Sequence, residues 1–220
     1  MIETRRIFAD RAEAGFELGK LLQNRYKNKN ALVLGIPRGG AVVACEVAGA
    51  LNAELSVVIT KKLQHPHYHG RSIGAVAEDG SSFFSSHVCD LDKSLVQKAH
   101  TTQLREISNR VNTFRKGKQL PGMSNRVVII VDDGIATGST IVPAIKLCRS
   151  RKASKIIVAA PVSSRSYVAE INMLADEVVI AEQPSNFYAV GQFYHDFQTL
   201  SDSHVVAHLD RCQPGYRRRI

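Results

Sequence analysis

Two adjacent carboxylates, Asp132 and Asp133, stand directly after an apolar run and before a loop rich in small hydroxyl side chains. The run Val127–Val131 has the continuous apolar character of a central parallel strand covered on both faces. Thr137-Gly138-Ser139-Thr140 then leads into a predicted helix at 139–149. Backbone N–H groups and hydroxyls at a helix start can cradle a phosphate, and two carboxylates suit a sugar diol or a bound Mg²⁺. The stretch therefore predicts a site for a phosphorylated sugar.

Other interpretations fit this stretch less well. Gly134 and Gly138 are too close together for a Walker A loop, and no lysine precedes Ser139. The glycine spacing of the dinucleotide-binding fingerprint is also absent. A simpler interpretation makes Asp132-Asp133-Gly134 a plain turn and Ser139 a helix cap. The complete series of strand, paired carboxylates, turn and hydroxyls favours a ligand site over that interpretation.

The elements that must position this stretch alternate between strand and helix patterns along the chain. Apolar runs predict strands at 31–36, 55–59, 73–77, 82–84, 127–131, 156–160 and 178–180. Helical spacing and caps predict helices at 10–22, 41–51, 92–114, 139–149 and 164–174. This alternation predicts an α/β fold with a doubly wound, mostly parallel sheet, whose ligands bind at the carboxyl ends of the strands.

Size and composition restrict the class of protein. The 220 residues suit one α/β domain. No apolar run approaches the roughly 20 residues that a membrane span needs, and the charged segment Met1–Arg11 lacks the apolar core of a signal peptide. We therefore expect a cytoplasmic location and no membrane partner.

The cysteines and the basic charge point to no further site. Cys45, Cys89, Cys148 and Cys212 are scattered, so we expect neither structural zinc nor a disulfide framework, and we expect Cys45 and Cys148 to be small core residues. The net charge of +9 attracts anions. Much of it lies in a linker and in the tail at 217–219, so we expect solvated surface and no nucleic-acid partner. The histidines of His65-Pro66-His67-Tyr68-His69 belong to a polar loop, for which we favour a mobile lid over a metal site.

The motif Val131-Asp132-Asp133-Gly134-Ile135-Ala136-Thr137-Gly138-Ser139-Thr140 closely resembles the phosphoribosyl-diphosphate (PRPP) motif of type I phosphoribosyltransferases. Ile36-Pro37-Arg38-Gly39-Gly40 is similar to that family's diphosphate-binding loop. Lys61-Lys62 through Gly74 stands where the family has its flexible catalytic loop. Together with Ile-Gly-Ala-Val-Ala and Phe-Tyr-Ala-Val-Gly, these strings most resemble a poorly characterised bacterial branch of the family.

The resemblance implies a role for each matching residue. Asp132 and Asp133 would contact the ribose hydroxyls, directly or through Mg²⁺, and Lys61 or Lys62 would close over the diphosphate. Tyr188 occupies the place of an aromatic residue that stacks on the base. The residues implied to bind PRPP, besides the two aspartates, are Arg38, Gly39, Gly40, Ala136, Thr137, Gly138, Ser139 and Thr140.

The resemblance also implies a domain plan and an activity. A single domain would span residues 1–220, with a flexible loop at about 61–72 and a hood from 1–25 and 183–212. The protein would be a Mg²⁺-dependent transferase and a homo-oligomer that moves the phosphoribosyl group of PRPP to a small nitrogenous acceptor. A non-catalytic PRPP or nucleotide sensor that uses the same pocket is the alternative. Since 6-oxopurine members with an acidic residue at the place of Ala136 use it near the base, hypoxanthine and guanine should be poor acceptors.

Overall fold

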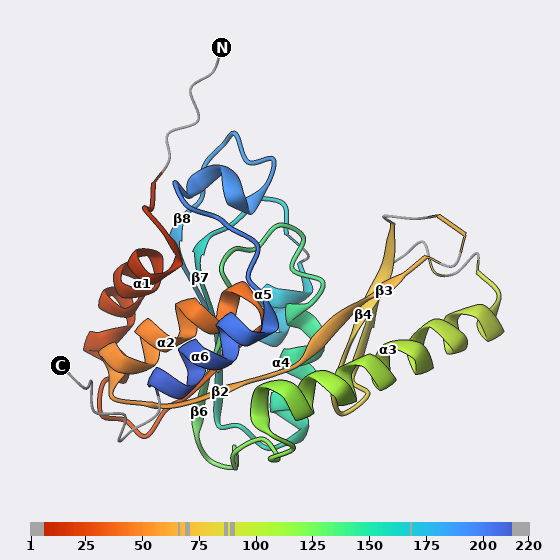
Figure 1. Ribbon diagram of the computed structural model, residues 1–220, viewed down its shortest axis with the longest axis horizontal. Coiled ribbons are helices and arrows are strands. Elements are labelled where there is room, and N and C mark those ends of the chain that lie inside the picture. The colour runs from red at the N-terminus through yellow and green to blue at the C-terminus, as the bar shows by residue number, and fades with distance from the viewer. Residues whose placement is uncertain are drawn as a thin grey trace.

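The computed structural model of the chain describes residues 7–65, 67–68, 71–85, 88, 91–167 and 169–212. Its centre is a five-stranded sheet in which all neighbouring strands are parallel (Figure 1). In spatial order the strands are β2 (Glu54–Val57), β1 (Leu32–Gly35), β6 (Val127–Val131), β7 (Lys155–Val162) and β8 (Glu177–Glu182). The parallel α/β architecture predicted from the sequence is confirmed.

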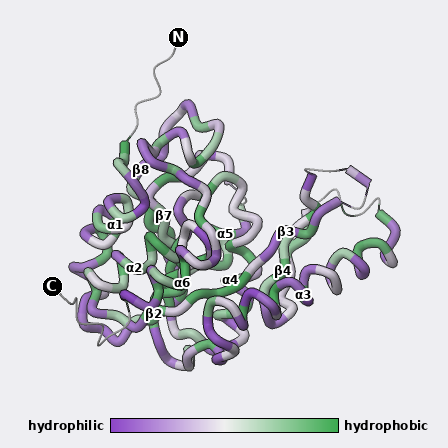
Figure 2. The backbone as a smooth tube through the Cα atoms, in the orientation of Figure 1, coloured by the Kyte–Doolittle hydropathy of each residue, from purple (hydrophilic) through white to green (hydrophobic). Residues whose placement is uncertain are grey.

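Helices cover both faces of this sheet because its strands are apolar on both sides. Along β1, Val33 packs into the core of one face, while Leu32 and Leu34 pack into the core of the other, as the period of two in a strand requires. Figure 2 shows hydrophobic residues gathered along these central strands. The first face is covered by α1 (Arg11–Tyr26), α2 (Gly39–Leu51) and α6 (Asp202–Cys212), and the second by α4 (Ile141–Ser150) and α5 (Glu170–Leu174).

The helices depart most from the sequence-based prediction at α5 and α6. α5 begins at Glu170, later than the helix expected at 164–174. α6 was not predicted, because its apolar face in the buried core consists of only Val205 and Leu209. Within the described residues, no helix combines the length and the apolar character that crossing a membrane requires.

A three-stranded antiparallel sheet and the long helix α3 (Lys93–Arg115) project from the central sheet as an arm (Figure 1). Its strands are β3 (Thr60–Gln64), β4 (Ser72–Ala77) and β5 (Ser82–Phe84). Leu63 and Ile73 of this sheet share a buried cluster with Ile107 of α3. The loop predicted at 61–72 is therefore confined to 65–71, because Lys61–Gln64 pairs with β4. Residues 66, 69 and 70 of that connection, which include two members of the histidine motif, lie outside the described residues.

The two terminal segments meet at the carboxyl end of β7. The amide of His195 donates to the carbonyl of Phe8 at 2.8 Å, and the amide of Phe8 donates to the carbonyl of Phe193 at 3.0 Å. These residues surround the 3-10 helix η2 (Val190–Phe193) and bury Tyr194 together with Val162. The residues expected to form a hood therefore fall into two groups. Those around Phe8 and Phe193 pack together at the carboxyl end of β7, whereas α1 and α6 pack with α2 against the sheet.

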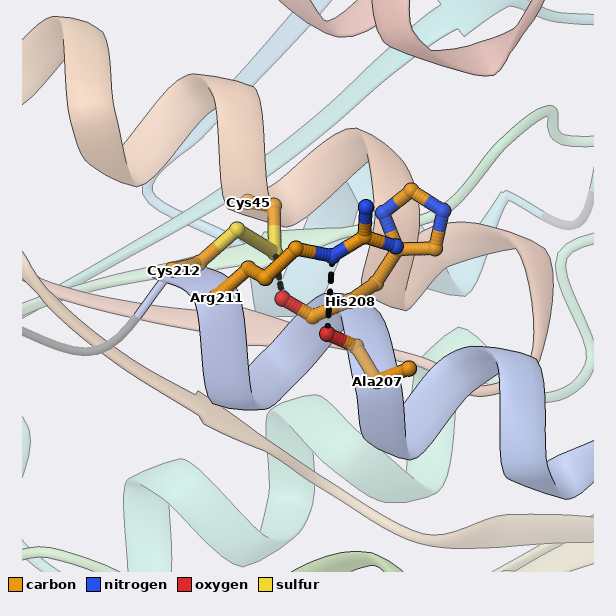
Figure 3. Close-up of a disulfide and its surroundings, with 5 residues drawn as sticks. All are labelled: Cys45, Ala207, His208, Arg211 and Cys212. Carbon is orange, nitrogen blue, oxygen red and sulfur yellow. Dashed lines mark hydrogen bonds between the residues drawn. A yellow bond between two sulfur atoms is a disulfide. The ribbon is translucent and has the colours of Figure 1, made fainter. Parts of the chain in front are cut away.

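A disulfide joins Cys45 in α2 to Cys212 at the end of α6, with their Cα atoms 5.7 Å apart (Figure 3). The expectation that the cysteines form no disulfide is therefore wrong, although Cys45 is a buried core residue as expected. Because 167 residues separate the two cysteines in the sequence, their spacing carries no signal. The pairing becomes possible only when α6 packs across α2. Cys148 is free and buried, as expected.

Candidate functional site

Residues 132–140 form a loop between β6 and α4, which we name the β6–α4 loop, in the middle of the sheet's carboxyl edge. The amide of Ile36, just after β1, donates to the carbonyl of Val131 at 2.9 Å. The amide of Ile135 donates to the carbonyl of Val162 in β7 at 2.9 Å. The loops that follow β1, β6 and β7 therefore meet at the edge where open α/β sheets bind ligands.

The second half of the β6–α4 loop is an open turn. Gly138 has φ +76°, and a Cβ there would lie 2.4 Å from the side chain of Ile171, so both conformation and space require glycine. The hydroxyls of Thr137 and the buried Ser139 lie 3.3 Å apart. Within the part of the chain that the structure describes, the amides of 136–138 and 140 donate to no backbone carbonyl. Together with the start of α4, they are available to bind a phosphate.

Asp132 is partly buried at the end of β6. Its Oδ1 accepts a 2.9 Å hydrogen bond from the amide of Asp133. Burial raises the pKa of the Asp132 carboxyl well above its ordinary value, and the neighbouring charge of Asp133 raises it further. The charge of Lys62 lowers the pKa of this carboxyl, against the two larger effects.

Asp133 is held by side chains from both ends of the chain. Its Oδ2 accepts a hydrogen bond from Nε of Arg11 at 2.7 Å, and its carbonyl accepts one from the hydroxyl of Tyr194 at 2.6 Å. Burial, and then the charge of Asp133, raises the pKa of Tyr194, so that the hydroxyl stays protonated as a donor. No sequence pattern marks Arg11 as a site residue, because 122 residues separate it from Asp133.

The turn after β1 and the first residues of α2 are pressed against these carboxylates. A Cβ on Gly39 would lie 1.8 Å from Oδ2 of Asp133, and one on Gly40 would lie 2.7 Å from the carbonyl oxygen of Val131. Glycine is therefore required at both positions by close approach. Arg38, beside them, is 39% exposed, and its Nη1 lies 3.9 Å from Oδ1 of Asp202. Such a loose, exposed pair leaves the guanidinium able to move to a ligand.

The two candidate lysines differ in their surroundings. Neighbouring residues of a strand point to opposite faces, and in β3 Lys61 forms an ion pair with Glu106 of α3. Lys62 is exposed and acts electrostatically on Asp132. Lys61 is thus engaged by α3, and Lys62 points to the other face of β3.

The candidate stacking residue Tyr188 lies in the segment before η2. Its side chain is 83% exposed, and its backbone amide donates to Oε1 of Gln192 at 2.7 Å. Nearby, a Cβ on Gly134 would lie 2.4 Å from Cγ1 of Val190, so this segment packs directly against the β6–α4 loop. Two other aromatic residues of the region, Phe193 and Tyr194, are fully buried, whereas Phe187 and Phe197 are only partly buried.

Known proteins resemble this chain over most of its length. Two curated relatives from Mycobacterium tuberculosis, strains CDC 1551 and H37Rv, bear provisional names as phosphoribosyl transferases and are each 39% identical over 214 residues. The match covers 96% of this chain and 48% of each relative, so the chain spans about half the length of these proteins.

Solved structures share the fold. The crystal structure of TT1426 from Thermus thermophilus superposes with a TM-score of 0.78 at 34% identity, covering 92% of this chain and 97% of that one. A purine phosphoribosyltransferase from Pyrococcus horikoshii superposes with a TM-score of 0.50 at 15% identity, covering 89% and 97%. The phosphoribosyl transferase domain family matches residues 8–198, a range that contains the whole site. The chain therefore belongs to the phosphoribosyl transferase domain family and has its type I fold.

Proposed function

We propose that the chain binds PRPP at the carboxyl edge of the central sheet and transfers its phosphoribosyl group to a nitrogen nucleophile, releasing diphosphate. The observation that carries this proposal is the convergence of three features. The paired carboxylates Asp132 and Asp133 lie between the open amides of the β6–α4 loop and the glycine-rich start of α2 at 38–40. The amides suit the 5-phosphate, the carboxylates suit the ribose hydroxyls, and Arg38 and Lys62 suit the diphosphate.

The reaction breaks the bond between the anomeric carbon and diphosphate, and a bond from that carbon to nitrogen forms. Its transition state resembles an oxocarbenium ion with a departing anion. Asp132 and Asp133 would orient the ribose ring through its hydroxyls. Arg38 and Lys62 would stabilise the charge that develops on the leaving diphosphate, which is where preorganised cations act most strongly.

Asp132 and Asp133 fit a Mg²⁺ ion that arrives with the substrate. Mg²⁺ is usually held by one or two carboxylates together with substrate phosphates, and no group of three or more metal-binding side chains occurs among the described residues. When bound, the ion would supply positive charge beside the diphosphate. Its remaining ligands would have to come from PRPP and water.

The acceptor is limited by Ala136, whose methyl group cannot exchange a proton with a base. Hypoxanthine and guanine should therefore be poor acceptors, even if Tyr188 stacks on the ring. Calorimetry with PRPP and Mg²⁺ tests whether the chain binds PRPP. A screen of nucleobases and other amines for diphosphate release then tests whether it transfers the phosphoribosyl group, and to which acceptor. Binding with release for one acceptor supports the transferase, and absence of PRPP binding contradicts it. A robust rate with hypoxanthine or guanine would overturn the argument from Ala136.

A PRPP or nucleotide sensor is the second candidate. It is favoured by two observations, the absence of a proton-exchanging side chain at Ala136 and the ion pair that holds Lys61 on Glu106. The same experiment separates the two functions. A sensor binds PRPP but releases no diphosphate with any acceptor in the screen.

A further inference from the structure

Asp133 is held at three of its four polar atoms. Its amide donates to Oδ1 of Asp132 at 2.9 Å, its carbonyl accepts from Tyr194 at 2.6 Å, and its Oδ2 accepts from Arg11 at 2.7 Å. Across the described ranges of the chain, no donor reaches Oδ1 of Asp133. A carboxylate fixed in this way presents one oxygen in one direction.

The Arg11 guanidinium that fixes Asp133 is itself fixed from the C-terminal segment. Its Cζ lies 3.8 Å from the centre of the Phe197 ring, within the range of a cation–π contact. Its Nη1 donates to the carbonyl of Gln198 at 3.1 Å. The side chain is only 11% exposed, and that of Asp133 is 16% exposed. Residues from the beginning, middle and end of the chain therefore form one contiguous contact.

The backbone of Arg11 is also restrained. It is the first residue of α1, and Asp10 caps that helix by accepting a 2.8 Å hydrogen bond from the amide of Glu13. On the far side of the ion pair, a Cβ on Gly39 would lie 2.8 Å from Nε of Arg11. The guanidinium thus lies between Gly39 at the start of α2, the Phe197 ring and the Asp133 carboxylate. It has little room to adopt another orientation.

We propose that Arg11 is a positioning residue that orients Asp133 toward the ribose hydroxyls of PRPP, and that Phe197 acts on the site through Arg11. This inference rests on the proposed function. Arg11 has Nε and Nη1 engaged by protein atoms and is largely buried, so it acts through Asp133. A charge-assisted anchor that uses two nitrogens in this way requires the planar guanidinium, and a lysine can replace only its charge.

The test measures PRPP binding in the presence of Mg²⁺ by calorimetry for wild type, Arg11→Met and Arg11→Lys. The matched control is Arg25→Met, because Arg25 lies at the other end of α1 and pairs with Glu177. Loss of a side chain that orients a metal-binding group typically costs about ten- to hundredfold in metal affinity or activity. We expect Arg11→Met to fall in that range, Arg11→Lys to recover part of the loss, and Arg25→Met to bind like wild type.

A purely structural role would lower the melting temperature of Arg11→Met without this selective loss of PRPP. With an acceptor identified, KM for PRPP should rise more than kcat falls. Phe197→Leu removes the ring and keeps the charge, so it tests the same contact if Arg11→Met does not fold, and it should also weaken PRPP binding. Wild-type affinity for PRPP in both Arg11→Lys and Phe197→Leu would overturn the inference about Arg11 and leave the proposed function standing. Absence of PRPP binding by the wild type would overturn the proposed function, and the inference with it.

Discussion

Arg115 and Glu78 form a two-pronged ion pair at the base of the arm, and their side chains are only 7% and 10% exposed. Nη1 of Arg115 also donates to the carbonyl of Val57 at 3.1 Å, and Glu78 accepts from the amide of Ile59 at 3.0 Å. The pair therefore connects the end of α3 to the end of β4 and to the edge of the central sheet.

Removing one member of this pair should be strongly destabilising, because the other charge stays buried without a partner. Arg115→Met should lower the free energy of unfolding by about 3–5 kcal/mol, measured by urea denaturation. Lys116→Met is the control, since the neighbouring Lys116–Asp210 pair is exposed and should contribute at most about 1 kcal/mol. Equal effects of the two substitutions would show that the buried pair has no special role.

The Cys45–Cys212 disulfide should stabilise the packing of α6 on α2. A disulfide constrains the unfolded chain and typically contributes about 2–4 kcal/mol. The free energy of unfolding of Cys212→Ser should be lower than that of the wild type by an amount in this range. Adding a reductant should destabilise the wild type without affecting Cys212→Ser. Counting free thiols before and after reduction identifies the bonded pair. A wild type whose stability is unchanged by reductant would contradict this expectation.

His208 makes the stability of the same helix depend on pH. Burial lowers the pKa of this imidazole, and the charge of Arg211 lowers it further. Since the unfolded chain binds a proton at a higher pH than the folded one, the stabilising contribution is present above pH 6.5 and is lost as the pH falls through the lower folded-state pKa. His208→Gln should flatten the decrease in stability between about pH 7 and pH 5. An identical pH profile in the variant would show that another group causes the decrease.

Lys62 should contribute more to the site than its neighbour Lys61. Lys62 acts on Asp132, whereas Lys61 is paired with Glu106. Lys62→Met should weaken PRPP binding by about tenfold or more, the effect of losing roughly 1.4 kcal/mol of binding free energy. Lys61→Met should stay within about threefold of wild type on the same scale. The reverse order would mean that Lys61 leaves Glu106 when the ligand binds.

The sequence predicts the structure best where the residue pattern of a segment favours the same element that the segment forms in the fold. The apolar run at 127–131, the carboxylates and the small residues after them predicted the strand, the loop and the helix in their actual order. Gly39 and Gly40 begin α2, and the structure requires glycine at both positions because the backbone there comes close to Asp133 and Val131. That these residues bind a ligand stays a prediction from the family resemblance.

What the sequence did not predict depends on contacts between distant segments. The Arg11–Asp133 pair, the Glu78–Arg115 pair and the Cys45–Cys212 disulfide each join residues whose spacing carries no periodic signal. β3 was interpreted as part of a loop because two lysines and a glutamine outnumber its buried Leu63, and only pairing with β4 makes it a strand. These contacts follow from tertiary packing, which no local pattern contains.

The most direct test of the proposed site is the affinity of Asp133→Asn for PRPP in the presence of Mg²⁺, measured by calorimetry beside the wild type. The control is Asp210→Asn, because Asp210 of α6 forms an exposed ion pair with Lys116. Since the amide of asparagine carries no charge to hold Mg²⁺ or to pair with Arg11, we predict that Asp133→Asn binds PRPP at least about tenfold more weakly. Its far-ultraviolet circular dichroism should match the wild type. Wild-type affinity in folded Asp133→Asn would contradict the assignment of this carboxylate to the ribose and its metal.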